Sequence, residues 1–179
     1  MIEAAVTNTA TAEPIAVVII SPCAAWARRC PAAEDLARAA VLAALAHDAA
    51  DSWLGCGAVL EIGVSLADDA AQQALNRDWR GTDRPTNVLA FPAWEPGTPV
   101  PPGAPVLLGD VVLAFETVAR EAEEQGKPFA HHLSHLIVHG ILHLLGYDHA
   151  TDADAEAMER LETSILAGLG VPDPYRGTM

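Results

Sequence analysis

The chain has 179 residues, which suits one domain of ordinary size and is short for two. Hydrophobic residues make up 51% and charged residues 19%, a globular composition that excludes a disordered or low-complexity chain. The formal net charge of -14 argues against a surface that binds polyanions in general, because such binding needs Lys and Arg arrayed against phosphates. Any contact with nucleic acid must therefore be local.

The N-terminal segment predicts neither a secretory signal nor a membrane span. It has no basic stretch followed by an apolar one, and no apolar run approaches the roughly 18 residues needed to cross a bilayer. We therefore expect a soluble, cytoplasmic protein with no membrane partner. Residues 1–14 are polar and rich in Ala and Thr, which indicates a flexible tail before a single domain at 15–175. The three cysteines lack metal-type spacing and are expected to be reduced structural thiols: Cys23, Cys30 and Cys56.

The first half of the chain alternates strands with helices. A β-branched run between prolines predicts a strand, and an Ala- and Leu-rich stretch after Pro31 predicts a helix. The next segment alternates apolar with other residues, so one face of a second strand is apolar. The predicted elements are a strand at 15–20, a helix at 32–51, a strand at 58–67 and a helix capped by Asp68 or Asp69 that runs to Trp79.

The second half adds two strands and three helices. The strands are separated by a loop at 92–105 that holds six of the thirteen prolines and is long for a connection, which favours an insertion or a lid-like excursion. The predicted elements are strands at 86–91 and 106–114 and helices at 115–126, 128–146 and 152–168. The whole pattern predicts an α+β fold, with a small mixed four-stranded sheet packed with about five helices.

The helix at 128–146 is apolar on nearly every side, so we expect it to lie in the core. It carries His135, His139 and His143, whose spacing of four residues lines their side chains along one stripe. A buried neutral imidazole costs free energy unless its ring nitrogens find hydrogen bonds or a metal. A single such histidine is more often a hydrogen-bonded core residue. Three on one stripe favour a metal ion, because one ion satisfies several rings at once.

The segment "HGILHLLGYDH", residues 139–149, predicts how a metal is held. His139 and His143 lie one turn apart, Gly146 predicts the helix end in a left-handed conformation, and His149 returns from the turn. Three histidines leave a fourth position for water or substrate, which is the open arrangement of catalytic zinc sites. Cysteine-rich sets are usual in closed, structural sites, and this favours the open site. The alternatives for a fourth ligand are His135, Asp148 and a cysteine.

The same segment nearly matches the signature of the metzincin proteases, in which a Glu follows the first histidine as general base. Here the residue after His139 is Gly140. Without that Glu, a peptidase lacks the group that takes a proton from the attacking water. The sequence therefore argues against a peptidase and leaves the metal ligands in place.

The segment "HGILHLLGYDH" resembles the HGxLHLxGYDH signature of the YbeY family, which are bacterial metal-dependent endoribonucleases and rRNA maturation factors. Two further segments resemble blocks of that family, in the family's order: "LNRDWRGTDRPTNVLAFP" at 75–92 and "LLGDVVLA" at 107–114. The resemblance spans most of 15–175. The chain departs from the family at Ala90, where Ser is usual, and in a long tail and Pro-rich loop. None of these departures removes a metal ligand.

The resemblance implies roles for individual residues. It implies that His139, His143 and His149 are zinc ligands that bind one ion per chain at the end of a central helix, with another divalent metal as the alternative. It also implies a functional Arg80, in a turn that brings it towards the metal cleft. A guanidinium can bind phosphate oxygens in a fork and stabilise charge that develops on phosphorus.

Other residues are weaker candidates. Three of the ten basic residues fall within "RDWRGTDR", so this segment is the one local basic patch. Candidates for RNA contact beside Arg80 are Arg77 and Arg84. Candidates for contact with the metal ligands or the substrate are His135, Asp148 and Asp110. The histidines expected on the surface, without a role, are His47, His131 and His132.

The resemblance implies a zinc-dependent endoribonuclease specific for single-stranded RNA, acting in maturation of the 16S rRNA 3′ end and in ribosome quality control. The implied partners are rRNA and the small ribosomal subunit, together with a small-subunit ribosomal protein and an Era-type GTPase. Because the chain is acidic, we expect weak binding to free RNA. Two alternatives stay open: a ribosome-assembly factor whose zinc is mainly structural, and a metallohydrolase of another small substrate.

Overall fold

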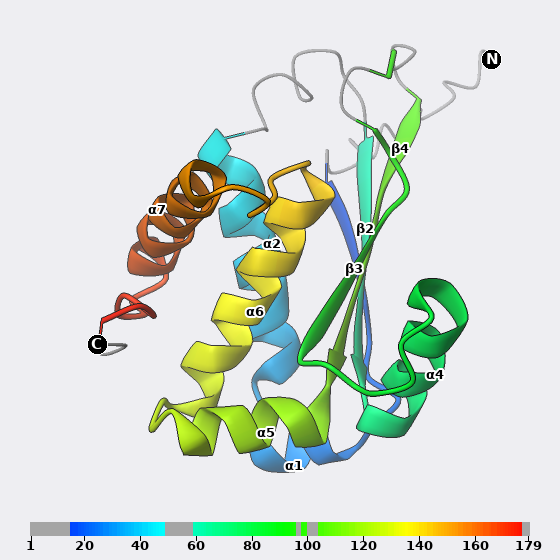
Figure 1. Ribbon diagram of the computed structural model, residues 1–179, viewed down its shortest axis with the longest axis vertical. Helices are drawn as coiled ribbons and strands as arrows, with labels where there is room; N and C mark the ends of the chain where they lie inside the picture. Colours follow the sequence, from blue (N-terminus) through cyan, green and yellow to red (C-terminus); the bar gives the residue numbers. More distant parts are fainter. Residues whose placement is uncertain (1–14, 49–58, 96–97, 100–103, 177–179) are drawn as a thin grey trace, which may run out of the picture.

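A mixed four-stranded sheet forms the centre of the protein in the computed structural model (Figure 1). Three strands run parallel, and the fourth runs antiparallel to the strand beside it at one edge. In spatial order they are β1 (Ile15–Ile20), β2 (Val59–Ala67), β4 (Pro105–Ala114) and β3 (Val88–Pro92). The α+β fold with a small mixed sheet is therefore confirmed.

The structure describes residues 15–48, 59–95, 98–99 and 104–176. The predicted tail, the end of the predicted helix at 32–51, Cys56 and part of the Pro-rich loop lie outside the described residues. Cys23 and Cys30 are free, half-buried thiols that pack against the core, as expected for structural cysteines. Across the described ranges, the structure has no helix with both the length and the apolar character needed to cross a bilayer.

Six helices surround the sheet in the described part of the chain: α1 (Ala25–Arg29), α2 (Ala33–Asp48), α4 (Asp69–Arg80), α5 (Phe115–Glu124), α6 (Phe129–Leu144) and α7 (Asp152–Gly168). Five of them were predicted within a few residues, and α1 was missed. With five residues, α1 is too short to show a helical period. Tertiary contacts hold it instead, because the fully buried Trp26 donates its indole N–H to the Ala67 carbonyl at 2.8 Å.

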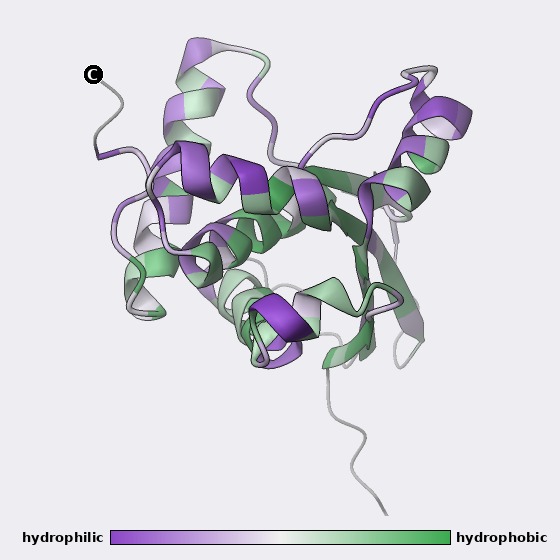
Figure 2. Ribbon diagram, turned by 90° about the horizontal axis from the view of Figure 1, so that it is seen from below, coloured by the Kyte–Doolittle hydropathy of each residue, from purple (hydrophilic) through white to green (hydrophobic). Residues whose placement is uncertain are grey.

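Helices cover the two faces of the sheet unequally. α2 and α6 pack together on one face, with α7 and α5 beside them, and α4 packs against the other face (Figure 1). In Figure 2 the hydrophobic residues lie where these helices meet the sheet. The alternation predicted for β2 is confirmed, because its apolar set is buried: Leu60, Ile62, Val64 and Leu66. α6 lies in the core as predicted, with eleven of its residues buried.

Side-chain hydrogen bonds decide two boundaries that the pattern left open. Asp68 is the cap of α4, since its carboxylate accepts from the Ala71 N–H at 2.8 Å. Asp69 instead accepts from both the backbone N–H and the hydroxyl of Thr117. β3 begins at Val88, two residues later than predicted, because the Thr86 N–H is bound by a glutamine of α4 instead of the sheet.

Candidate metal centre

The end of α6 brings the three predicted histidine ligands together. The helix ends at Leu144, and Gly146 reverses the chain with a φ of 94°, a left-handed conformation that favours glycine. Ring centroids lie 4.6 Å apart for His139 and His143, and 5.2 Å apart for His143 and His149. One nitrogen from each of the three rings lies within 4.8 Å of the others, so the cluster can hold a metal ion.

The outer partners of two rings show which nitrogens face that ion. His139 Nδ1 lies 2.7 Å from a carboxylate oxygen of Glu162, and His143 Nδ1 lies 2.9 Å from the Tyr147 carbonyl. Both partners can only accept, so each Nδ1 carries the hydrogen and each Nε2 keeps a lone pair. The two Nε2 atoms lie 3.1 Å apart. Two facing lone pairs repel unless a cation lies between them, so the rings fit a metal.

The charge state of His143 supports the same conclusion. Burial, followed by the neighbouring rings of His139 and His149, lowers its pKa to about 4. The imidazole is therefore neutral at pH 7. A neutral ring is the form that ligates a metal, and no proton must be released from it on binding.

Glu162 organises this centre, and sequence reasoning missed it. It lies on α7 with no exposed surface, and it accepts hydrogen bonds from His135 at 3.0 Å, from His139 and from the Tyr175 hydroxyl. Burial alone would raise its pKa, but these three hydrogen bonds lower the pKa to about 2. A carboxylate on the outer nitrogen of a metal-ligating histidine fixes the tautomer and orientation of the ring. A signal existed, because Glu162 interrupts the apolar stripe of buried α7 residues Met158, Ile165 and Leu166.

The position after the first ligand cannot carry a general base. Gly140 is buried in α6, and a Cβ there would lie 2.7 Å from Cγ1 of Val111 on β4. The helix approaches the sheet so closely at this point that any side chain would clash. Position 140 therefore faces the sheet and not the metal ligands, which strengthens the prediction that this is no metzincin-type peptidase.

Two of the candidates for a fourth ligand bind other groups, and Cys56 lies outside the described residues. His135 Nε2 binds Glu162, and a carboxylate oxygen of Asp148 accepts from the His149 N–H at 2.8 Å. Among the described His, Cys, Asp and Glu residues, the metal-type cluster contains the three histidines alone. Within the described residues the cluster therefore offers three protein ligands, as an open site does, and His135 bonds the same carboxylate as His139.

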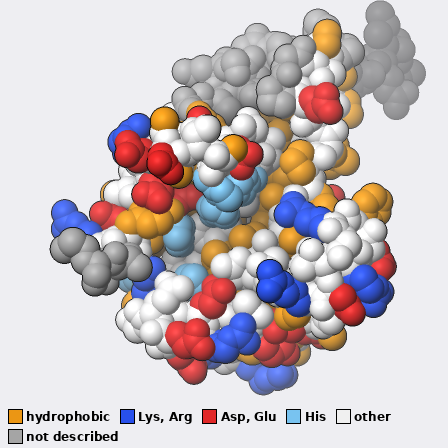
Figure 3. Space-filling model, in the orientation of Figure 1, with side chains coloured by type: hydrophobic (Ala, Val, Ile, Leu, Met, Phe, Trp, Pro, Cys, Tyr) orange, Lys and Arg blue, Asp and Glu red, His pale blue; other side chains and the backbone are white. Residues whose placement is uncertain are grey.

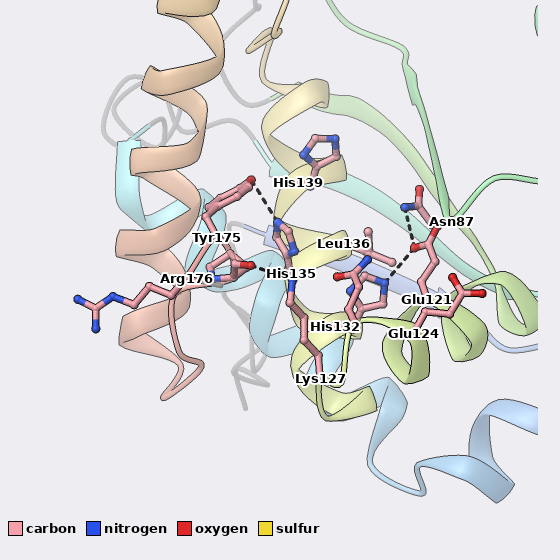
Figure 4. Close-up of a pocket in the computed structure, with 12 residues that line it drawn as sticks. Asn87, Glu121, Glu124, Lys127, His132, His135, Leu136, His139, Tyr175 and Arg176 are labelled. Carbon is pink, nitrogen blue, oxygen red and sulfur yellow. Dashed lines mark hydrogen bonds and ion pairs between the residues drawn. The ribbon is translucent and has the colours of Figure 1, made fainter. Parts of the chain in front are cut away.

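A polar cavity of about 660 Å³ adjoins the centre (Figure 4). It runs along α6 from His139 past His135 to His132, and its wall includes Asn87, Glu121 and Tyr175. The prediction that His132 lies on the surface is wrong: the residue is 3% exposed and its Nε2 lies 3.0 Å from Glu121. Burial raises the pKa of Glu121, but hydrogen bonds from His132 and Asn87 outweigh it, so the net shift is downward. This carboxylate is thus ionised at the end of the cavity.

Among the arginines of the predicted basic patch, Arg80 contacts β3, at the edge of the sheet. Arg80 is the last residue of α4 and not part of a turn, and its guanidinium donates to the Ala90 carbonyl at 2.8 Å. Arg77 pairs with Asp78 at 2.9 Å, and the Arg84 side chain is exposed. In Figure 3 the histidine side chains and several Lys and Arg side chains share one face, with a hollow between them.

Asp110 does not belong to this site. Its carboxylate lies over Gly63 of β2, where a Cβ would be 2.0 Å from it, and it lines a shallow cavity with Val18 and Leu107 on the sheet face opposite α6. The predicted contact between Asp110 and the metal ligands is wrong, because Val111, the next residue, is the one that faces α6. Asp148 lies in the turn beside His149.

The α+β fold places, at the end of a core helix, three histidines that could hold a metal ion, which is the ligand set expected of a metal-dependent enzyme. The family model described as Endoribonuclease YbeY matches residues 31–170. A protein named Endoribonuclease YbeY from Paramagnetospirillum magneticum is 56% identical over 162 residues, which cover 90% of this chain and 96% of that one. Its counterpart from Bradyrhizobium sp. is 54% identical over 160 residues, covering 89% and 90%. The chain belongs to the YbeY family, as the sequence motifs predicted.

A solved structure has a similar fold. The solution structure of TM1509 from Thermotoga maritima aligns with a TM-score of 0.52 at 21% sequence identity, covering 92% of this chain and 99% of that one. At this identity the likeness concerns the fold alone.

Proposed function

We propose that the chain is a zinc-dependent endoribonuclease that cleaves phosphodiester bonds in single-stranded RNA. The observation that carries the proposal is the pair of Nε2 atoms of His139 and His143, 3.1 Å apart and each held by an acceptor behind the ring. His149 completes the three-histidine face. Membership of a family whose relatives are named endoribonucleases supports RNA as the substrate.

In this proposal, different side chains of the protein bind the metal, bind the phosphate and orient a metal ligand. A zinc ion held by the three histidines supplies a Lewis acid beside the phosphodiester. Arg80 uses one of its five N–H donors on the Ala90 carbonyl, and the others can bind phosphate oxygens and stabilise developing charge. Glu162 keeps His139 in the tautomer that ligates the metal.

We further propose that the substrate is the 3′ end of 16S rRNA and that the protein works on the small ribosomal subunit, in the cytoplasm. The net charge of -14 supports docking on a partner, because an acidic protein gains little from phosphate contacts outside one local basic patch. A small-subunit ribosomal protein and an Era-type GTPase are the proposed protein partners. The proposed cleavage would serve both maturation of the small subunit and its quality control.

One experiment tests the metal-dependent cleavage. The pure protein is incubated with a short single-stranded RNA that carries the 16S rRNA 3′ end, with and without chelator, and bound metal is measured in parallel. We expect cleavage by the wild type, loss of both metal and cleavage in His143→Ala, and loss of cleavage with retained metal in Arg80→Ala. His47→Ala is the matched control, since the His47 ring bonds the Ser164 hydroxyl and is not one of the three clustered histidines. Cleavage that survives chelation and His143→Ala would contradict the proposal.

A mainly structural zinc has less support. Helices α6 and α7 are already joined without a metal by the Glu162 hydrogen bonds to His135 and His139 and by buried apolar side chains. Thermal unfolding with and without chelator separates the two roles. A fold that persists after metal removal agrees with a catalytic ion, whereas unfolding would favour the structural one.

A further inference from the structure

Trp79 is a large aromatic residue that lies mostly in solvent. At 75% exposure it exceeds the other exposed large hydrophobic residues of the described chain, among them Val18 at 60% and Leu42 at 41%. An aromatic ring of this size in water forgoes a large gain from burial. It lies in the last turn of α4, directly before Arg80, at the β3 edge.

The indole is held in a defined position by its neighbour on β3. The rings of Trp79 and Phe91 have centroids 6.5 Å apart and planes inclined at 66°, an edge-to-face contact. The Arg80 guanidinium lies 5.8 Å from the centre of the Phe91 ring while it donates to the Ala90 carbonyl. An edge contact orients the indole and leaves ring surface open to solvent, so a flat group can stack on it.

Residues 77–84, next to this ring pair, carry three arginines and two aspartates, Asp78 and Asp83. Arg77 lies one position before Asp78 in the same turn, Arg80 follows Trp79, and Arg84 comes shortly after. All three arginine side chains are exposed, in a chain whose net charge is strongly negative. Aromatic faces interleaved with guanidinium groups are the platform on which single-stranded nucleic acids bind, because bases stack while phosphates pair with the cations.

We propose that Trp79, supported by Phe91, is a stacking site for an unpaired nucleobase next to the phosphate that Arg80 binds. The inference rests on the proposed function and adds to it a substrate-binding residue and a reason for single-strand specificity. The bases of a duplex are stacked inside the helix and cannot reach the indole. Every base has a π face, so the site selects unpaired RNA without selecting a sequence.

The stacking site lies where a bound RNA could extend from it towards the histidines. α6 packs on β3 from one side, as the approach of Gly140 to Val88 shows, and α4 places Trp79 and Arg80 at the edge of the same strand. The basic and histidine side chains share the face in Figure 3. The stacking site and the three histidines therefore lie on elements that pack against the same strand, so one RNA strand can contact both.

Binding is measured by fluorescence anisotropy with a 5′-labelled single-stranded RNA of about 12 nucleotides, within the usual range of single-strand site sizes. Titrations are run on ice, and a gel checks that the probe stays intact. We expect Trp79→Ala to raise Kd by about 5- to 150-fold, the effect of losing one stacked base. Trp79→Phe keeps a flat ring and stays near the wild type, whereas Trp79→Leu keeps an apolar side chain without a π face and binds as weakly as the Ala variant. The matched control is Leu42→Ala, which removes an exposed apolar side chain on α2.

Salt dependence separates stacking from charge. The slope of log Kd against log salt stays at the wild-type value in Trp79→Ala and becomes smaller by about 0.7 in Arg77→Ala if that arginine contacts a phosphate. A Kd for Trp79→Ala or Trp79→Leu equal to that of the wild type, with cleavage intact, overturns the stacking site and leaves the proposed function standing. A wild type that neither binds nor cleaves single-stranded RNA overturns both. Equal losses for single-stranded and duplex probes also overturn the inference.

Discussion

Replacing Glu162 with Gln tests whether the carboxylate behind the histidines sets the properties of the metal centre. Glu162 is fully buried and accepts hydrogen bonds from His139 at 2.7 Å, from His135 at 3.0 Å and from the Tyr175 hydroxyl. Gln keeps the shape but offers one acceptor oxygen, and its amide group is a donor that faces another donor. The substitution therefore removes a charge and at least one hydrogen bond without opening a cavity.

Two quantities are expected to change in Glu162→Gln. The free energy of unfolding of the metal-free protein falls by about 1.5–3 kcal/mol, the usual value of one hydrogen bond to a charged group. Affinity for Zn²⁺ falls by roughly 10- to 100-fold, because His139 loses the partner that fixes its tautomer and orientation. The control is Glu159→Gln on the same helix, which changes the same charge at an exposed position and is expected to leave both quantities near the wild type.

Competition with a chromogenic chelator measures the Zn²⁺ affinity, and urea unfolding of the metal-free proteins measures the stability. An unchanged affinity in Glu162→Gln, with or without a loss of stability, would refute the reasoning. It would mean that Glu162 only joins α6 to α7 and does not act on the metal through His139.

Three more predictions concern the same region. The pKa of Glu162, about 2 in the folded protein against an ordinary 4.5, makes its stabilising effect complete above pH 4.5 and lost as the pH falls towards 2. The stability gap between the metal-free wild type and Glu162→Gln should narrow over that interval in urea titrations, and a constant gap would contradict the shift. Gly140→Ala should lower the free energy of unfolding by about 1–3 kcal/mol, because its Cβ would lie 2.7 Å from Val111. Gly168→Ala, where nothing lies within 4 Å, should not be destabilised, and equal urea midpoints for both variants would argue against the close packing. His149→Ala should abolish tight Zn²⁺ binding but leave the melting temperature of the metal-free protein unchanged, since the side chain is exposed; a lower melting temperature would show a structural role.

Local patterns determined most of the elements and the metal ligands. The alternation in β2 and the apolar residues around α6 are properties of neighbouring residues, so a period of two or of nearly four reveals them. The three ligands follow from the same local geometry: His139 and His143 are one turn apart, and Gly146 permits the turn that returns His149. The resemblance to one family rested on this segment and on two further ones, at 75–92 and 107–114, and was confirmed by comparison with known proteins.

Contacts between distant segments decided the rest. Glu162 lies 23 residues from His139 and 27 from His135, so only the packing of α7 on α6 reveals it as their partner. Asp110 was predicted near the metal ligands but lies on the opposite face of the sheet, because a strand pattern does not say which helices cover which face. His132 is buried because α5 brings Glu121 against it. The sequence by itself determined the histidines that can bind a metal, since their spacing along one helix suffices. The tertiary structure decided the tautomers and the stacking partner of Trp79, since these depend on elements that meet only in the fold.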